Sequence, residues 1–232
     1  MRTNLLRDIE SAERPAPEEH TAIERLILKH AMRSFGKRGY AGTTLRGIAA
    51  EAGVTAPMVG YYFHSKEGLF HRVAEIVMSS LESEVRASVE EANGFVETVR
   101  AIAAAHVELA ERSPSAVEFM FAMLYGPQED QPQPDIEGMY AGTRRRMAEV
   151  FEKGIASGEF APRNGMSVGF LVEQLGSLLH DHVSRKFRFD RLLEHNPEKR
   201  AELEARSRDW SLEVALDHFF FGAGELRRRE QG

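Results

Sequence analysis

The sequence has no cysteine and a single tryptophan among its 232 residues. Without cysteine the chain can form no disulfide, no thiolate metal site and no cysteine nucleophile, and such a composition suits a reducing compartment. No apolar run approaches the roughly 20 residues of a membrane span, and the polar N-terminus offers no apolar stretch of signal-peptide length. We therefore expect a cytoplasmic protein.

Signs of catalysis are also scarce. The sequence contains no H-E-x-x-H motif and no glycine-rich phosphate loop, and its carboxylates show no pairing typical of acid–base catalysis. His180 and His182 lie two positions apart in a predicted helix, where side chains point about 200° away from each other, so they cannot chelate one metal ion together. We expect no catalytic residue, no metal site and no cofactor, and hence not an enzyme.

Charge is unevenly distributed along a chain whose net charge is -6. The segment from Thr21 to Lys66 holds seven lysine and arginine residues against two glutamates, a net charge of +5, which leaves -11 for the remainder. A basic N-terminal segment on an acidic body is typical of a polyanion-binding module attached to another domain. A difference of this size also arises by chance in some chains, so charge alone leaves both interpretations open.

Apolar residues recur at helical spacing through most of the chain, and no stretch alternates convincingly with the period of a strand. The predicted fold class is therefore all-α. The predicted helices cover residues 23–35, 45–52, 56–63, 66–91, 94–112, 114–125, 136–158, 165–187 and 205–222. The first helix should stop at the glycines between Gly36 and Gly39, and residues 1–20 should form a mobile arm.

Two short predicted helices near the N-terminus meet at a glycine. Thr43 and Thr44 are N-cap candidates for the first of these helices, and Thr55 is the candidate for the second. Pro57 falls in the first turn of the second helix, where its missing N–H is not needed. Gly53 can make the turn between them, and Ala49 is small enough to let the helices approach. This pattern predicts a helix-turn-helix, whose second helix enters the DNA major groove. The generic pattern also matches many unrelated helix pairs.

Four motifs make the interpretation more specific. FGKRGY, TTLRGIA, AGVT and YYFHSKEGL follow one another between residues 35 and 69. In order and spacing, the stretch from Ala22 to Phe70 resembles the N-terminal domain of the TetR family of bacterial transcriptional regulators. The resemblance implies a helix-turn-helix DNA-binding domain over residues 21–80. A long helix would join it to a helical ligand-binding and dimerisation domain over residues 81–232.

The resemblance also implies which residues contact DNA. The second short helix becomes the recognition helix, and the hydroxyl, phenol, imidazole and ammonium groups around it are suited to phosphate oxygens. The implied contacts are Thr44, Arg46, Thr55, Ala56, Pro57, Met58, Gly60, Tyr61, Tyr62, His64 and Lys66. Without the motifs, the two tyrosines would be ordinary half-buried residues and Lys66 a solvated lysine.

The recognition helix departs from the family pattern at two positions. Many members carry an aromatic residue where this chain has Gly60, and a basic or polar residue near Ala56. The helix also lacks the arginine, asparagine or glutamine that makes bidentate base contacts. Base readout is therefore expected to rest on Thr55, Tyr61, contact of Ala56 or Pro57 with thymine methyl groups, and DNA shape.

The remaining helices are rich in methionine and phenylalanine. Such residues at helical spacing are usually core, but the resemblance implies that some of them line a cavity for a small apolar or aromatic effector. The expected ligand-binding residues are Phe95, His106, Phe119, Met120, Met123, Met147, Phe151, Phe170 and Gln174.

These observations together predict a ligand-responsive transcriptional regulator. We expect a repressor that binds a palindromic double-stranded DNA operator as a homodimer and is released by its effector, with the last two predicted helices as the dimer interface. One alternative is a helical ligand carrier or small enzyme whose N-terminal helices merely resemble a DNA reader. Another is a transcriptional activator or an oligomerisation scaffold.

Overall fold

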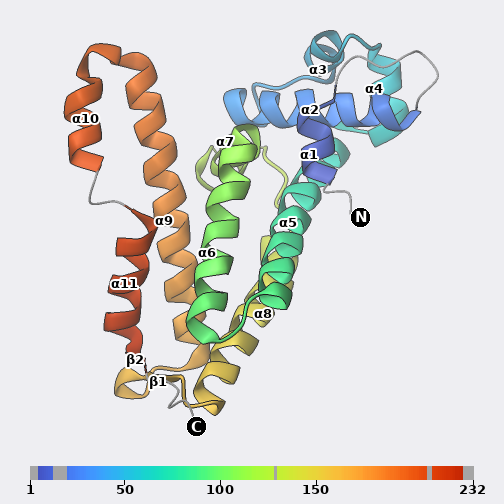
Figure 1. Cartoon of the computed structure of the whole chain (residues 1–232). Helices are drawn as coiled ribbons and strands as arrows, with labels where there is room; N and C mark the ends of the chain where they lie inside the picture. Colours follow the sequence, from blue (N-terminus) through green and yellow to red (C-terminus); the bar gives the residue numbers. More distant parts are fainter. Residues whose placement is uncertain (1–4, 13–19, 128–129, 208–210, 227–232) are drawn as a thin grey trace. The chain divides into compact units, whose positions relative to one another are not determined.

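The computed structural model describes residues 5–12, 20–127, 130–207 and 211–226 (Figure 1). Helices make up nearly all of the regular structure in these ranges, so the predicted all-α fold is confirmed. The chain divides into two compact units. The first unit holds Met1–Glu82 with Ala110–Tyr140, and the second unit holds Ser83–Leu109 with Ala141–Gly232.

The first unit contains the predicted helix-turn-helix. Its elements are α1 (Leu5–Glu10), α2 (His20–Arg38), α3 (Leu45–Ala52), α4 (Ala56–Phe63), the first part of α5 (Lys66–Glu91), the end of α6 (Phe95–Arg112), α7 (Pro114–Tyr125) and the start of α8 (Ile136–Ala156). Helix α2 packs against α1, α3 and α7, and α3 packs against α4. The predicted bounds of α3, α4 and α5 are confirmed.

Aromatic rings form the centre of the first unit. The ring centroid of Phe70 lies 5.2 Å from that of Phe35 and 5.2 Å from that of Phe119. All three side chains are at most 1% exposed. Tyr40 adds its ring at the edge, with its centroid 5.2 Å from that of Phe70. This cluster joins α2, α5 and α7 into one core.

Helix α2 ends at Arg38, before Gly39, whose φ is 67°, so it stops within the predicted range between Gly36 and Gly39. Gly36 has another role, because a Cβ placed there would lie 2.9 Å from the Cβ of Glu118 and 2.9 Å from the backbone nitrogen of Phe119. The glycine is therefore needed for the close packing of α2 on α7. The sequence alone offered no sign of α7 as the partner.

Helix α1 was not predicted, because two apolar residues in a polar segment are too few to show a period. Leu6 and Ile9 are each 1% exposed. The Glu10 carboxylate accepts hydrogen bonds from the hydroxyls of Ser113, at 2.8 Å, and Ser115. Residues 1–4 and 13–19 of the predicted arm lie outside the described residues. The predicted domain bounds remain a prediction.

The second unit is built on α6, α8 and three C-terminal helices. Its further elements are β1 (Phe160–Pro162), η1 (Arg163–Gly165), α9 (Val168–His195), η2 (Pro197–Lys199), α10 (Arg200–Ser207), α11 (Leu212–Ala223) and β2 (Gly224–Leu226). Helix α9 extends beyond its predicted end, and α10 and α11 replace the single helix predicted over residues 205–222. None of the described helices is long and apolar enough to cross a membrane.

Two short strands of the second unit were also not predicted. β1 pairs antiparallel with β2, with Phe160 opposite Leu226. Three-residue strands are too short to show alternation in a sequence. The Phe160 ring stacks on Phe95 at 4.7 Å between centroids, and both contact Phe151, so this pair closes one side of an aromatic core.

Candidate nucleic-acid interface

Local capping signals in the sequence produce the turn between α3 and α4. The Thr44 hydroxyl accepts a hydrogen bond from the Gly47 N–H at 3.1 Å, and the Thr55 hydroxyl accepts one from the Met58 N–H at 3.4 Å. Gly53 ends α3 with a φ of 66°, and its N–H is bonded to carbonyls of the preceding turn. Each capping hydroxyl keeps its own hydrogen, so Thr44 and Thr55 can still donate to a phosphate oxygen.

One face of α4 is buried and the opposite face is open. Val59 and Phe63 point inward and are almost fully buried. Thr55, Pro57 and Tyr61 are exposed, and Tyr61 presents 73% of its surface to solvent. A residue this large and this exposed on a short helix contributes little to the core. The open face is therefore available for contact with another molecule.

Tyr62 lies beside Tyr61 and is half-buried, with the two ring centroids 5.4 Å apart. Burial raises the pKa of Tyr62 above its ordinary value, and the neighbouring Tyr61 and Glu24 raise this pKa further. The phenol stays protonated at neutral pH and can donate a hydrogen bond to a phosphate oxygen. Ala56 and Met58 are half-buried on α4, and Arg46 is exposed on α3.

Gly60 sits in the interior of α4, where an added Cβ would meet no atom within 4 Å. Glycine at such a position destabilises a helix by about 0.5–1 kcal/mol relative to alanine. The packing of the first unit therefore gives no reason for a glycine here, in contrast to Gly36.

His64 ends α4 in a conformation that few side chains adopt. Its φ is 63° and its ψ is -47°, and the Ser65 N–H donates to the Phe63 carbonyl at 2.7 Å across it. This is a γ-turn of the strained kind, with positive φ at a residue that is not glycine. The His64 side chain is exposed.

Lys66 makes contacts that the sequence did not predict. Its Nζ donates to the carbonyl oxygens of Tyr40, at 3.1 Å, and Thr43, at 3.2 Å. The same ammonium lies 4.0 Å from the centre of the Tyr40 ring. Lys66 thus connects the start of α5 to the segment between α2 and α3, while its third N–H remains suited to a phosphate oxygen.

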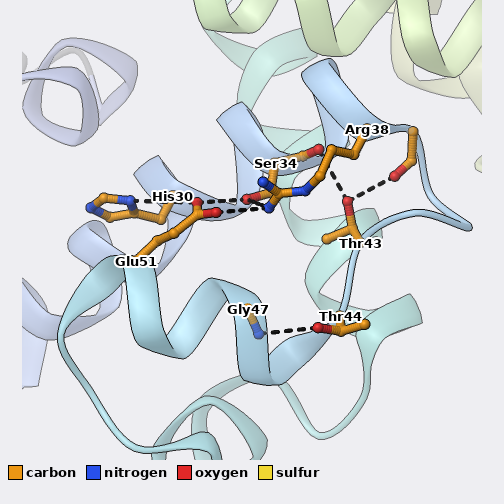
Figure 2. Close-up of polar contacts among 8 residues, drawn as sticks. His30, Ser34, Arg38, Thr43, Thr44, Gly47 and Glu51 are labelled. Atoms are coloured by element: carbon orange, nitrogen blue, oxygen red, sulfur yellow. Dashed lines mark hydrogen bonds and ion pairs between the residues drawn. The ribbon is translucent and has the colours of Figure 1, made fainter.

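A polar network that connects α2 to α3 was also not predicted from the sequence (Figure 2). The Glu51 carboxylate accepts a hydrogen bond from the Ser34 hydroxyl at 2.9 Å and lies 2.9 Å from Arg38 Nη2. Arg38 Nη2 also donates to the Ser34 hydroxyl at 2.6 Å. Nδ1 of His30 lies 3.9 Å from Glu51. Residues of α2 thereby hold the end of α3, next to the turn that leads into α4.

Thr43 has a different role from its neighbour Thr44, although both were N-cap candidates in the sequence. Thr43 is 1% exposed, and its hydroxyl donates to the carbonyls of Ser34, at 3.0 Å, and Gly39, at 2.8 Å (Figure 2). It therefore fixes the loop before α3 onto the end of α2. Thr44 alone caps α3.

The Glu51 network gives the first unit a predictable response to acid. Burial raises the pKa of Glu51, but the hydrogen bonds from Ser34 and Arg38 and the charges of Arg38 and His30 outweigh it, so this pKa lies below its ordinary value of 4.5. Stability from Glu51 is therefore complete above about pH 4.5 and is lost as the pH falls through the lower, folded-state pKa.

We expect Glu51→Gln to lower the unfolding free energy at pH 7 by about 0.5–1 kcal/mol, since the carboxylate is partly exposed and screened. The variant should lose less additional stability than the wild type when acidified below pH 4.5. Urea unfolding at pH 7 and at several values between pH 5 and pH 3 measures both effects. Parallel losses in the two proteins would contradict the network as drawn.

The predicted ligand-binding residues fall into different units. Phe119, Met120 and Met123 belong to the first unit, and Phe119 is occupied by the ring cluster with Phe35 and Phe70. The second unit contains Phe95, His106, Met147, Phe151, Phe170 and Gln174.

Five of the second-unit residues lie either in the packed core or on the exposed surface. Phe95 and Phe151 pack together in its aromatic core, with centroids 5.4 Å apart. Phe170 and Gln174 are exposed on α9. Met147 is 1% exposed.

His106 carries one unsatisfied polar atom. Its Nδ1 lies 2.8 Å from the Ile102 carbonyl, which can only accept, so Nδ1 bears the hydrogen. Burial lowers the pKa of His106, although the bond to Ile102 opposes this shift, and the ring is neutral at pH 7. Its Nε2 is then a bare acceptor, buried and without a partner among the described residues. The Thr143 hydroxyl is also buried without a partner there.

One hydrolase-like pattern in the sequence, GMSVG from Gly165 to Gly169, matches G-x-S-x-G and was overlooked. The Ser167 hydroxyl accepts from the Phe170 N–H at 3.2 Å as the N-cap of α9. A serine nucleophile needs a base to take its proton, and no contact of Ser167 within the described ranges supplies one. Nor do the described residues contain a group of three or more potential ligands that could hold a metal ion.

Comparison with known proteins supports the interpretation of the first unit as a helix-turn-helix DNA-binding domain. Residues 27–73 match the family model described as bacterial regulatory proteins, tetR family, and the resemblance read from the sequence motifs is confirmed. The HTH-type transcriptional regulator BetI of Brucella canis is 29% identical over 97 residues, which cover 42% of this chain and 49% of BetI. The chain thus spans about half the length of this relative.

Two further comparisons extend beyond the first unit. The HTH-type transcriptional repressor SCO4008 of Streptomyces coelicolor is 26% identical over 140 residues, 60% of this chain and 70% of that protein. The crystal structure of the transcriptional regulator FadR from Bacillus subtilis in complex with stearoyl-CoA superposes with a TM-score of 0.64 at 18% identity, covering 86% of this chain and 98% of FadR. At this identity the likeness shows the fold.

Proposed function

This chain carries a TetR-type DNA-binding domain, and from that premise we propose that it is a transcriptional repressor that binds a palindromic operator as a homodimer and is released by a small apolar or aromatic effector. The observation that carries the proposal is the capped α3–α4 pair, with its exposed face on a segment of net charge +5. We place its action in the cytoplasm, where operator DNA is found.

Exposed apolar side chains support a dimer through α9 and α11. Val214 and Phe221, two turns apart on α11, are 42% and 74% exposed. On α9, an added Cβ at Gly169 or Gly176 would meet no atom within 4 Å, so the helix surface is open and flat at these two positions, which lie two turns apart. Apolar and flat surfaces of this kind are typical of an interface between two copies.

Phe221→Glu should convert the dimer into a monomer, because two buried carboxylates would face each other across the two-fold axis. We expect the operator affinity to fall at least tenfold, since one helix-turn-helix then engages only one half-site. Sedimentation velocity and fluorescence anisotropy measure the two effects. Tyr125→Glu, at an exposed residue of the first unit, is the control and should leave the dimer intact; a dimeric Phe221→Glu protein would contradict this interface.

An effector site in the second unit is supported by its unsatisfied polar atoms. Nε2 of His106 and the Thr143 hydroxyl are the kind of groups that orient a mainly apolar ligand. FadR, which shares the fold, was crystallised with stearoyl-CoA, a ligand with a long apolar chain.

Helix α5 offers a route for the response to effector. It is continuous from Lys66 to Glu91 and so contributes residues to both units. The effector would favour the conformation that it binds better. If that conformation changes the spacing of the two recognition helices, the dimer can contact only one half-site of the operator, and its affinity falls. Equal operator affinity of the effector-bound and free protein at fixed salt would contradict induction.

The direct test of the proposed function is anisotropy with labelled duplex from upstream of the protein's own gene. We expect saturable binding that exceeds binding to an unrelated duplex of equal length. A ligand carrier or enzyme would show no such preference. Deleting the gene should raise transcription of the neighbouring genes if the protein represses them, and lower it if the protein is an activator.

A further inference from the structure

Helix α4 and its C-cap include two residues that the local backbone conformation disfavours. At Gly60 the helix would be more stable with alanine, and there is open space for the methyl group. At His64 the positive φ would be adopted more readily by glycine. Gly60→Ala and His64→Gly would therefore each stabilise the chain.

The two positions lie close together in sequence. Residues four apart are neighbours on a helix surface, as Ala56 and Gly60 are on α4, and His64 follows as the C-cap of the same helix. Gly60 lies about 100° around the helix from the buried Val59, on the flank between the buried face and the open face. Ala56 and Gly60 together leave this flank with almost no side-chain bulk, and the exposed His64 stands at its end.

We propose that this flank, defined by Ala56, Gly60 and His64, is shaped for direct contact with DNA at the expense of stability. Gly60 lets the backbone of α4 come within van der Waals distance of base edges, where small apolar surfaces suit the thymine methyl group. His64 is kept in its strained turn because its imidazole contacts a phosphate. The inference rests on the proposed DNA-binding function and identifies Gly60 as a specificity-determining residue.

The test is a pair of substitutions that should raise stability and weaken DNA binding at once. We expect Gly60→Ala and His64→Gly each to raise the thermal unfolding midpoint by about 1–3 °C. On a duplex selected from a random library by the wild-type protein, each should lower affinity by about tenfold. Gly60→Ala should affect the selected duplex more than an unrelated one, whereas His64→Gly should affect both equally, because phosphate contacts carry no sequence information.

The thymine contact has its own readout. Replacing thymine by deoxyuridine removes only the C5-methyl group, and at one position of the selected duplex this change should weaken the wild type. At that position, the affinity that Gly60→Ala loses relative to the wild type should be smaller on the uracil duplex than on the thymine duplex. The reason is that the added protein methyl fills the space left by the missing thymine methyl. Effects that simply add at every thymine would overturn the contact.

Two controls keep the outcomes separate. Gly36→Ala, the same exchange in α2, meets Glu118 and Phe119 and should lower the unfolding midpoint. His64→Asn keeps a residue that tolerates positive φ and should retain part of the affinity. A stabilised variant that binds DNA as well as the wild type would overturn the inference for that residue. Failure of the wild type to select any duplex would instead refute the proposed function.

Discussion

Replacing Phe119 with alanine is expected to lower the unfolding free energy of the first unit by about 3–5 kcal/mol, the largest effect on stability that we predict. The side chain is fully buried, and its ring contacts those of Phe35 and Phe70. Removing it opens a cavity at the point where α7 meets α2 and α5. Because the helix-turn-helix rests on α2, DNA binding should be lost together with the fold.

The measurement is urea unfolding followed by circular dichroism, with Phe119→Leu as the matched control that retains most of the volume. We expect the control to lose about 1–2 kcal/mol. A Phe119→Ala protein with near wild-type stability would show that α7 does not complete this core. That result would also mean that Phe119 remains available to contact an effector, as expected from the sequence.

Replacing Lys66 with alanine is expected to weaken binding to every duplex by about tenfold or more. Two consequences combine, because the ammonium donates to the Tyr40 and Thr43 carbonyls and, in our proposal, contacts a phosphate with its third N–H. Loss of the carbonyl contacts leaves the segment before α3 less firmly held. Loss of the phosphate contact should reduce the slope of log affinity against log salt concentration by about 0.9.

Lys37→Ala is the matched control for charge. Lys37 is exposed in the last turn of α2 and belongs to the same basic segment. Its removal deletes the same charge without touching the α3 segment, so it should leave the unfolding free energy nearly unchanged. If Lys66→Ala unfolds like the wild type and keeps the full salt slope, both roles assigned to Lys66 are wrong.

Much of the first unit could be predicted because its signals are local. Thr44, Gly53 and Thr55 act within one turn of their own helix, so their residue types were enough to place the ends of α3 and the start of α4. The motifs between residues 35 and 69 then located the family resemblance. Such features depend on neighbours in sequence rather than on partners elsewhere in the chain.

The features that were missed depend on contacts between distant residues. The packing role of Gly36 was missed because its partners, Glu118 and Phe119, lie more than 80 positions away. Glu51 was counted only as a charge, although Ser34 and Arg38 bind it. A periodic pattern shows that a side chain faces a core, but it does not identify the element that covers it.

The central claim is that this chain reads a specific DNA sequence through α4. The most direct test is fluorescence anisotropy of the purified wild-type protein at fixed salt, with duplex from upstream of its own gene and an unrelated duplex of equal length. The account predicts at least about a thousandfold preference for the specific duplex, with two protomers bound per site. Equal affinity for the two duplexes, or no binding to either, would contradict it.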